Sequence, residues 1–391
     1  MAEVALVLGI SERHSFRIKA RIREEGVKGV MHGNRGRRSD QKLALKIERR
    51  IVELARGRYR GFNDSHLTEK LTEEEGIEVC REKVRQILRS EGIASPRRRR
   101  APRHRSRRER RACEGMMLQV DGSPHEWLEG RGAALTLVGA IDDATSQVPG
   151  ALFVEAETSW AYLKLLLGVF KKKGLAHSVY SDRHKIFFTD REPTIEEQLA
   201  DKLPRTQVGR ALKELGVTLI PAGSPQAKGR IERLWGTFQD RLVSELRLKG
   251  AKTKEQAQAV LDHYLPQHNR RFAKSGNGTK PAWRLVDSKA LEQALCFKYQ
   301  RVVAKDNTVS FEGALFQIPK GSPCRSYAGK RVDVHVLLDG SVEFFYQAEK
   351  IAQFDSKTAH AFALYRTNGS REVSSYGSQT TTPTNLYELS P

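Results

Sequence analysis

The stretch 224–242, SPQAKGRIERLWGTFQDRL, decides how the rest of the chain is interpreted. Ser224 is a helix-capping residue type, and Pro225 stands where a first-turn proline loses no hydrogen bond. Apolar residues then recur every three or four positions, which predicts a helix with one buried face. They are Ile231, Leu234, Trp235, Phe238, Leu242 and Leu246.

A second face of this predicted helix carries Lys228 and Glu232, one helical turn apart. By itself, a Glu–Lys pair at this spacing is more typical of a solvated salt bridge than of chemistry. Two upstream acids favour another interpretation, because LQVD ends at Asp121 and SVYSD ends at Asp182, each closing a strand-like run. Two acids at strand ends and a glutamate on a following helix predict a metal-binding carboxylate cluster.

The composition indicates a nucleic-acid partner. The chain has 391 residues, enough for two to four domains, and carries a net charge of +21 with a pI near 9.9. Such a charge favours a polyanionic partner, nucleic acid before an anionic membrane. Residues 1–111 hold 31 Lys and Arg against 16 Asp and Glu, so +15 of the +21 lies there.

Membrane, secreted and zinc-binding classes are disfavoured. The longest apolar runs, near 133–141 and 165–170, are far shorter than the roughly 20 residues that cross a bilayer. No secretory signal precedes them. The four cysteines are scattered without a metal-like Cys/His spacing, which predicts free thiols in a reducing compartment. We therefore expect a cytoplasmic protein with no membrane partner and no structural zinc site.

Two helical units are predicted before the arginine-rich segment. Residues 1–32 resemble the last two helices of a helix-turn-helix unit whose first helix is missing, with an amphipathic hairpin as the alternative. Residues 39–93 predict a winged-helix-like domain with helices over 40–56, 64–74 and 80–90; a purely structural trihelical bundle is the alternative. The polar residues that we expect to reach DNA from the third helix are Lys83, Arg85, Gln86 and Arg89.

A linker is predicted over 94–115. Its central part, 95–111, reads SPRRRRAPRHRSRRERR, with ten Arg against one Glu. Like charges repel and nothing apolar is available to bury, so we expect an extended segment along DNA rather than a solvated spacer. The residues assigned to phosphate contacts are Arg97, Arg98, Arg99 and Arg100.

The pattern of predicted elements over 116–250 is that of an α/β domain. A helical connector and further strands are predicted beyond residue 250. Strands are expected over 117–121, 134–142, 150–155, 178–181 and 217–221, with helices over 159–172 and 208–215 before the glutamate helix. A connector over 251–290 contains a helix over 253–272 that Pro266 should kink, with HNRRFA and KPAWR in a loop on the core. Residues 291–352 predict a small β-barrel with a hairpin turn at Asp339-Gly340, and 353–391 a disordered tail.

Several motifs resemble a known family. LQVDGSPHEW, LVGAIDDATS, VYSDRHKIF, TQVGRALKELGVTLIPAGSPQAKGRIERLWGTFQDRL and HNRRFA are similar to the integrase-core DDE transposases of bacterial insertion sequences, and most similar to the ISNCY group within the retroviral-integrase superfamily. The resemblance covers most of the chain and is most specific across 117–272. It implies a ribonuclease-H-like core in which Asp121, Asp182 and Glu232 align with the DDE triad.

The chain departs from the family pattern in three ways. Forty-nine residues separate Asp182 from Glu232, more than in retroviral integrases, and an insertion over 187–205 accounts for the excess. The first helix-turn-helix unit is incomplete. The zinc-binding N-terminal domain of retroviral integrases is absent.

The resemblance implies a DNA transposase. Such an enzyme binds the terminal inverted repeats of its element, cleaves to expose 3′-OH ends and joins them to target DNA, as at least a homodimer on paired ends. Two Mg²⁺ ions, or Mn²⁺ instead, would be held with Asp121 between them, Asp182 on one and Glu232 on the other. Lys228 would lie over the scissile phosphate or the adjacent backbone.

Alternatives stay open at this point. His125 and His184 would support substrate or a neighbouring acid, or only pack. Asp142 and Asp143 compete as an acidic pair but follow a strand into a turn, where Asp is expected anyway. Trp127 and Trp235 are expected in the core. The rival functions are a DNA-binding regulator or catalytically decayed copy, and a structure-selective nuclease that cuts without joining.

Overall fold

The chain divides into two compact units in the computed structural model. One comprises Met1–Arg60 with Leu67–Ala94, and the other comprises Gly61–His66 with Ser95–Pro391. The structure describes residues 1–31, 43–96, 108–199, 203–223, 228–278, 280–321 and 326–357.

The first helices of the chain form a hairpin. Helix α1 (Ala2–Leu8) ends at Gly9, whose φ of 61° is in the left-handed region that glycine adopts easily. Ser11 then caps helix α2 (Glu12–Glu25) with its side-chain oxygen, and the short 3-10 helix η1 (Gly26–Val30) follows. The expected short helix, turn and basic helix are present, whereas a role of this hairpin in DNA binding stays a prediction.

Three helices follow, each with a buried apolar face. Representative buried residues are Ile51, Leu71 and Val84. The helix expected over 40–56 begins at Leu45, and residues 40–42 lie outside the described part. Described residues 43–96 contain no strand, so the wing of a winged-helix domain is not among them. The helices are α3 (Leu45–Arg56), α4 (Asp64–Glu73) and α5 (Arg81–Ser90).

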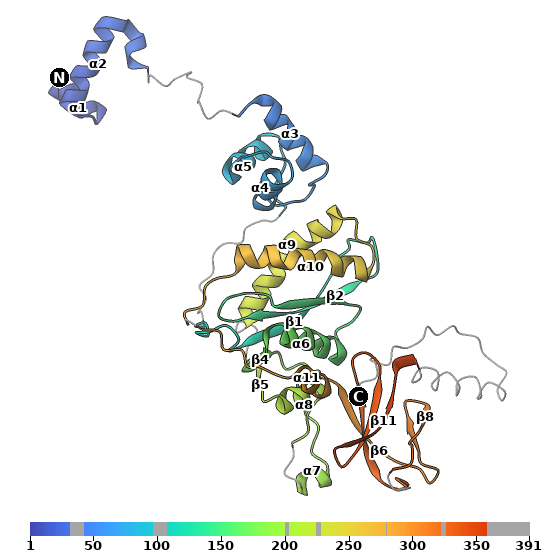
Figure 1. Ribbon diagram of the computed structural model, residues 1–391. Helices are drawn as coiled ribbons and strands as arrows, with labels where there is room; N and C mark the ends of the chain where they lie inside the picture. The colour runs from blue at the N-terminus through green and yellow to red at the C-terminus, as the bar shows by residue number, and fades with distance from the viewer. Residues whose placement is uncertain are drawn as a thin grey trace. The chain divides into compact units, whose positions relative to one another are not determined.

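A five-stranded sheet forms the centre of the second unit (Figure 1). Its strand order is β3-β2-β1-β4-β5; β1, β2 and β3 pair antiparallel, and β4 and β5 run parallel to β1. This is the arrangement expected of a ribonuclease-H-like core. The strands are β1 (Leu118–His125), β2 (Leu135–Asp142), β3 (Gly150–Val154), β4 (Ser178–Ser181) and β5 (Thr218–Pro221).

Asp121 does not close its strand, contrary to the expectation from the LQVD run. Strand β1 continues to His125 because its antiparallel pairing with β2 persists, and Asp121 stands opposite Gly139 in that register. The parallel partner β4 ends at Ser181, directly before Asp182. Both aspartates therefore lie where β4 stops, although only Asp182 follows the end of a strand.

Helices cover both faces of the sheet (Figure 1). Helices α6 and α8 share an apolar cluster with Val120 of β1, whereas α9 and α10 share another with Leu137 of β2. Successive residues of a strand face opposite sides, so Asp121 faces α9 when Val120 faces α6. The helices of this unit beyond residue 116 are α6 (Ser159–Lys173), α7 (Ile195–Leu199), α8 (Gln207–Glu214), α9 (Gly229–Leu248), α10 (Lys254–Phe272) and α11 (Ser288–Ala294).

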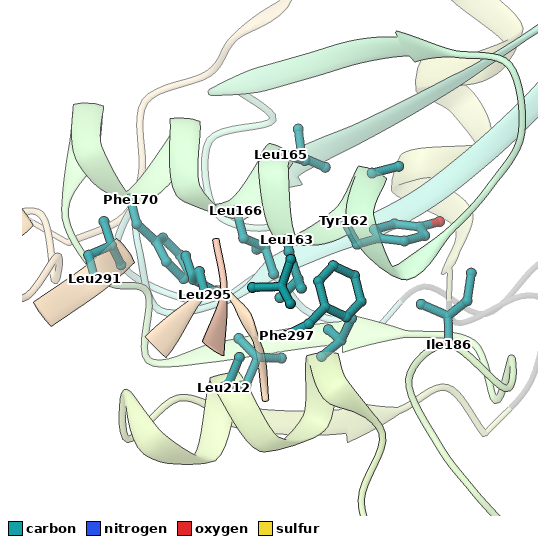
Figure 2. Packing of buried hydrophobic residues seen from close by; sticks show 14 of the residues in the cluster. Tyr162, Leu163, Leu165, Leu166, Phe170, Ile186, Leu212, Leu291, Leu295 and Phe297 are labelled. Carbon is teal, nitrogen blue, oxygen red and sulfur yellow. The ribbon is translucent and has the colours of Figure 1, made fainter. Parts of the chain in front are cut away.

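The cluster on the α6 face also holds the C-terminal strands against the core. Figure 2 shows Leu295 and Phe297 between α6, which carries Tyr162 and Phe170, and α8, which carries Leu212. All five side chains are buried. Helix α6, predicted at 159–172, therefore packs against both α8 and the residues that precede and begin the C-terminal strands.

Helix α10 covers the outer edge of the sheet. The Gln258 side chain accepts a hydrogen bond from the Phe153 N–H (2.9 Å) and donates one to the Ala151 carbonyl (3.3 Å). Asn269 likewise accepts from the Val148 N–H (2.8 Å) and donates to the Val148 carbonyl (3.0 Å). Gln258 thus satisfies main-chain groups of the edge strand β3, which otherwise invites pairing with another chain. Asn269 satisfies those of Val148, two residues before that strand.

The loop expected for HNRRFA is wrong, because most of this motif is helical. Residues 268–272 belong to the last turns of α10, and only Ala273 leaves the helix. The helix includes Pro266 and continues past it, because His268 is buried against Phe238 and Asn269 binds the main chain of Val148. Within the ranges that the structure describes, no helix is both long and apolar enough to cross a membrane.

The C-terminal strands form an open arrangement where a β-barrel was expected. Pairing among the described residues gives a four-stranded antiparallel sheet, β11-β10-β9-β6, and a separate β7–β8 hairpin, without closure. The turn at Asp339-Gly340 joins β9 and β10 as predicted. The strands are β6 (Phe297–Val302), β7 (Thr308–Phe311), β8 (Ala314–Gln317), β9 (Arg331–Val336), β10 (Val342–Tyr346) and β11 (Glu349–Phe354). Residues 358–391, most of the predicted tail, lie outside the described part.

Candidate active site

Three carboxylates that are far apart in the sequence line one cleft. Asp121 comes from β1, Asp182 follows β4, and Glu232 lies in the first turn of α9. The cleft has a volume of about 410 Å³ and is also lined by Arg183, Ala222, Gly223 and Lys228. Ser224 and Pro225, the expected helix start, lie outside the described residues, and α9 begins at Gly229.

Lys228 lies between the two aspartates. Its ammonium Nζ donates hydrogen bonds to Asp121 Oδ1 (2.7 Å) and to Asp182 Oδ2 (3.3 Å). Its side chain is only 11% exposed, compared with 17% for Asp121 and 45% for Asp182. The sequence left a salt bridge to Glu232 as an alternative, but the ion pairs of Lys228 in the described chain are with the aspartates.

Burial and the ion pair act in opposite directions on the pKa values of Asp121 and Lys228. Burial raises the pKa of Asp121, although hydrogen bonds from Lys228 and Trp235 act in the opposite direction. Burial also acts to lower the pKa of Lys228, but the hydrogen bond and charge of Asp121 and the charge of Asp182 outweigh it, and the net shift is upward. Lys228 is therefore a cation at neutral pH.

Trp235 is a site residue that the sequence placed only in the core. It is buried, and its indole Nε1 donates a hydrogen bond to Asp121 Oδ2 (3.2 Å). Because Trp235 is two helical turns from Lys228, the two residues lie on the same side of α9. That spacing is the signal that could have linked Trp235 to the site. Each oxygen of Asp121 thus has a donor from the α9 segment.

Glu157 was also missed. A Cβ added at Gly122 would lie 2.6 Å from Glu157 Oε2, so this carboxylate packs on the main chain directly after Asp121. The Tyr162 hydroxyl donates to Glu157 Oε1, and burial together with the charges of Glu157, Asp121 and Asp182 raises the pKa of Tyr162. Any residue larger than Gly at position 122 would therefore displace the Glu157 carboxylate.

The two histidines named as supports behave differently. The exposed ring of His125 packs edge-on against Trp127, with centroids 5.3 Å apart, and does not line the cleft. The backbone N–H of His184 donates to Asp182 Oδ1 (3.2 Å), while its ring Nδ1 accepts from the Ile186 N–H (3.3 Å). His184 thus orients Asp182 through its main chain.

The competing acidic pair is buried away from the cleft. Asp142 Oδ1 accepts from the Thr145 N–H and hydroxyl, both at 2.8 Å, which is the turn role expected for it. Asp143 is fully buried and forms ion pairs with Arg108 and Arg230. Neither side chain lines the cleft with the three acids.

The donor set suits a hard divalent cation. No group of three or more Asp, Glu, His or Cys side chains in the described chain is arranged closely enough to hold an ion. Asp121 and Asp182 instead share one cation, the Lys228 ammonium, and Glu232 faces the same cleft. Carboxylate oxygens are the ligands that Mg²⁺ prefers. The three residues therefore fit Mg²⁺ chemically, provided that the ammonium moves aside.

The predicted DNA contacts on α5 have partners within their own unit. Lys83 forms an ion pair with Glu48 (2.8 Å) and Arg85 with Glu82 (2.6 Å). Arg85 and Gln86 are exposed, whereas Arg89 donates to a carbonyl at the end of the helix. Arg97, Arg98, Arg99 and Arg100 lie outside the described residues.

Solved structures resemble the chain only weakly, and no protein-family model matches it. A simian T-cell lymphotropic virus intasome in complex with PP2A regulatory subunit B56 gamma has a TM-score of 0.31 at 16% identity, covering 54% of this chain and 66% of that chain. The HTLV-2 integrase catalytic core domain in complex with magnesium has a TM-score of 0.31 at 14% identity, covering 42% and 94%. Similarity at this level carries no argument about function.

Sequence relatives are decisive. The protein "Putative transposase y4bF" of Sinorhizobium fredii is 32% identical over 369 residues, which are 92% of this chain and 79% of that protein. The "Transposase for insertion sequence IS1202" of Streptococcus pneumoniae is 31% identical over 307 residues, 70% of this chain and 64% of that protein. The chain therefore belongs to the insertion-sequence transposases, polynucleotidyl transferases of the DDE integrase-core family that its motifs resemble.

Proposed function

We propose that this transposase binds the terminal inverted repeats of an insertion sequence, cleaves to expose 3′-OH ends and joins those ends to target DNA. The observation that carries the proposal is the cleft shared by Asp121, Asp182 and Glu232, with an ammonium held by two of the three carboxylates. The shared ammonium places the two aspartates close enough to hold one cation together.

Mg²⁺, with Mn²⁺ as a substitute, is the proposed cofactor, as two ions held by Asp121, Asp182 and Glu232. Such ions activate the attacking oxygen and stabilise the leaving 3′ oxygen of a phosphodiester. The chain itself orients the ligands: Trp235 and Lys228 hold the two oxygens of Asp121, and the His184 N–H holds Asp182. No protein nucleophile is needed.

Lys228 has a second proposed role once it leaves the aspartates. Its backbone lies at the start of α9, one turn before Glu232, and its side chain lines the cleft. There it would contact the scissile phosphate or the adjacent DNA backbone, as an ammonium attracts phosphate as a point charge.

Double-stranded DNA, both element ends and target, is the proposed partner. The net charge of +21, concentrated before residue 112, supports this. We assign sequence recognition to the helical units, with Lys83, Arg85, Gln86 and Arg89, and phosphate contacts to the arginine-rich linker. Two ends must be handled together, so the active form is at least a dimer, acting on the nucleoid in the bacterial cytoplasm.

Two other functions compete with this proposal. A DNA-binding regulator or decayed copy would keep the helical units without catalysis; the presence of all three acids around one cleft argues against it. A structure-selective nuclease with the same core would cut without joining.

A strand-transfer reaction tests the proposal. Purified protein is incubated with labelled DNA that ends in the element's terminal repeat, a plasmid target and Mg²⁺ or Mn²⁺. We expect joined product from the wild type and from Glu192→Gln, an exposed acid outside the cleft, but none from Glu232→Gln.

Each other outcome favours one of the other functions or contradicts the assignment of Glu232. Cut but unjoined DNA would indicate a nuclease. Tight binding without cutting by the wild type would leave the regulator or the decayed copy. Equal joining by Glu232→Gln and the wild type would remove Glu232 from the site.

A further inference from the structure

A single buried carboxylate connects three segments behind the cleft. Asp143, 0% exposed, follows β2. Its Oδ1 accepts from Gln119 Nε2 (2.8 Å), from Arg230 Nη1 (2.6 Å) and from Arg108 Nη2. Its Oδ2 accepts from the Arg111 N–H (2.8 Å).

Two of these partners belong to elements that carry catalytic acids. Gln119 precedes Asp121 by two residues on β1, so both side chains face α9. Arg230 lies in the first turn of α9, two residues before Glu232. The Gln119 Oε1 also accepts from the Ile231 N–H (3.4 Å), which ties the strand to the helix directly.

The other partners belong to the end of the arginine-rich linker. Arg108 and Arg111 are the last part of the block 95–111. The Arg108 carbonyl accepts from Arg230 Nη2 (3.1 Å), so the linker contacts the catalytic helix as well as Asp143. Arg110 adds hydrogen bonds to the carbonyls of Asp143 (3.1 Å) and Ala144 (2.9 Å).

We propose that Asp143 is a positioning residue that fixes the end of the arginine-rich linker to the catalytic helix, so that DNA held by the linker is aligned with the carboxylate cleft. This inference rests on the proposed transposase reaction. Its consequence is that Arg108 does not serve as a phosphate contact, because its Nη2 is held by Asp143, which it shares with Arg230. Loss of the junction should misplace the scissile phosphate without weakening DNA binding.

Arg108→Gln in the full-length protein tests this role. Arg108 is partly exposed, and Asp143 keeps its ion pair with Arg230 in this variant, so folding should be preserved. Arg108→Lys retains the charge, Asp143→Asn removes the anion, and Arg191→Gln, which loses a surface ion pair with Glu197, is the matched control. The readouts are unfolding temperature, Kd for end DNA and its salt dependence, joining rate at saturating DNA, and the position of the cut.

For Arg108→Gln we expect an unchanged unfolding temperature, an unchanged Kd for end DNA and an unchanged salt slope. Joining should be about tenfold slower, which corresponds to about 1.4 kcal/mol on the barrier. The cuts should spread over neighbouring phosphodiesters. Arg108→Lys should restore most of the rate and the single cut position. Asp143→Asn, if folded, should show the same spread.

Three results would overturn the inference. A joining rate and cut position equal to those of Arg191→Gln would mean that the junction does not align DNA. A Kd that weakens together with a salt slope lowered by about one would make Arg108 a phosphate contact. A lower unfolding temperature with an unchanged cut position would make the junction purely structural. Inactivity of the wild type itself would instead contradict the proposed function.

Discussion

The indole Nε1 of Trp235 lies 3.2 Å from Oδ2 of Asp121, so the helix that carries Glu232 also holds a carboxylate of the central strand. Lys228, at the start of the same helix, holds the other oxygen of Asp121. Any displacement of α9 therefore changes both the position of Glu232 and the orientation of Asp121. The geometry of the cleft depends on one helix.

Replacing Trp235 by Phe should reduce joining about tenfold and should also lower the stability of the protein. Phe keeps the edge-on packing against Phe238 but removes the donor to Asp121, and a hydrogen bond to a charged group contributes about 1.5–3 kcal/mol. Joining rates at saturating DNA, with a thermal melt of each protein, measure this. Trp160→Phe, half-buried on α6 and not in the cleft, is the control. Equal rates for both variants would show that the Trp235 bond is dispensable.

Gly139→Ala should reproduce the Trp235→Phe defect from the neighbouring strand. A Cβ at Gly139, which faces Asp121 across β1 and β2, would lie 2.9 Å from Trp235 Cη2. Overpacking of this kind costs about 1–3 kcal/mol, measurable by urea unfolding, and should also slow joining.

The matched control for this glycine is Gly168 on α6. A Cβ there meets no atom within 4 Å, and Ala is favoured over Gly in a helix by about 0.8–1 kcal/mol. Gly168→Ala should therefore be slightly more stable and fully active. A stable, active Gly139→Ala would show that Trp235 can shift without consequence.

Lys228→Gln should bind Mn²⁺ more tightly than the wild type while joining DNA more slowly. The ammonium occupies the space between Asp121 and Asp182, and an incoming cation must displace it against like-charge repulsion. Calorimetric titration without DNA should give a Kd about tenfold lower, equivalent to about 1.4 kcal/mol. Lys249→Gln, at the exposed C-terminal end of α9, should match the wild type. Weaker Mn²⁺ binding by Lys228→Gln would contradict this account.

His268 should make the protein less stable in acid. Burial, and then the charge of Arg241, lower the pKa of His268 from its usual 6.5 to about 4. The unfolded chain therefore binds the proton more readily, and the free energy of unfolding falls as pH decreases from about 6.5 to about 4, by up to about 3 kcal/mol, and levels off below.

His268→Phe should flatten this limb, because Phe can keep the ring packing against Phe238 without a titrating group. Denaturant unfolding at several pH values measures the slope. His263→Gln, exposed on the same helix, is the control and should keep the wild-type slope. Burial also lowers the pKa of His335 to about 4. His335 should therefore maintain part of the pH dependence of the free energy of unfolding in every variant. An unchanged slope in His268→Phe would refute the assignment.

The elements and the three acids could be predicted because their signals are local. The helical spacing of Ile231, Leu234 and Phe238 predicts the buried face of α9, and the structure buries all three. Where long-range pairing extends an element, prediction failed. Strand β1 continues past Asp121 because β2 pairs with it. The helix expected over 253–272 is present as α10, but the loop expected for HNRRFA is wrong because the core holds His268 and Val148 binds Asn269 within that helix.

Local sequence patterns could not predict which side chains contact one another inside the site. Lys228 and Asp121 are 107 positions apart, and Trp235 and Asp121 are 114 apart. Apart from the spacing that puts Trp235 on the Lys228 side of α9, nothing in either segment indicates that these side chains meet. The same holds for Asp143, whose turn position explains an aspartate without requiring the three segments that converge on it.

The sequence by itself determined the charge distribution and the order of helices and strands, which follow from composition and from the short periods of helix and strand. The resemblance of its motifs indicated the family, and the three acids were predicted from their places at strand ends and on the glutamate helix. Only the tertiary structure decided that an ammonium stands between two of the acids, that Trp235 orients one of them, and that the linker ends on the catalytic helix. The physical reason is that strand order and packing bring these groups together, and a one-dimensional pattern carries no record of which distant segments become neighbours.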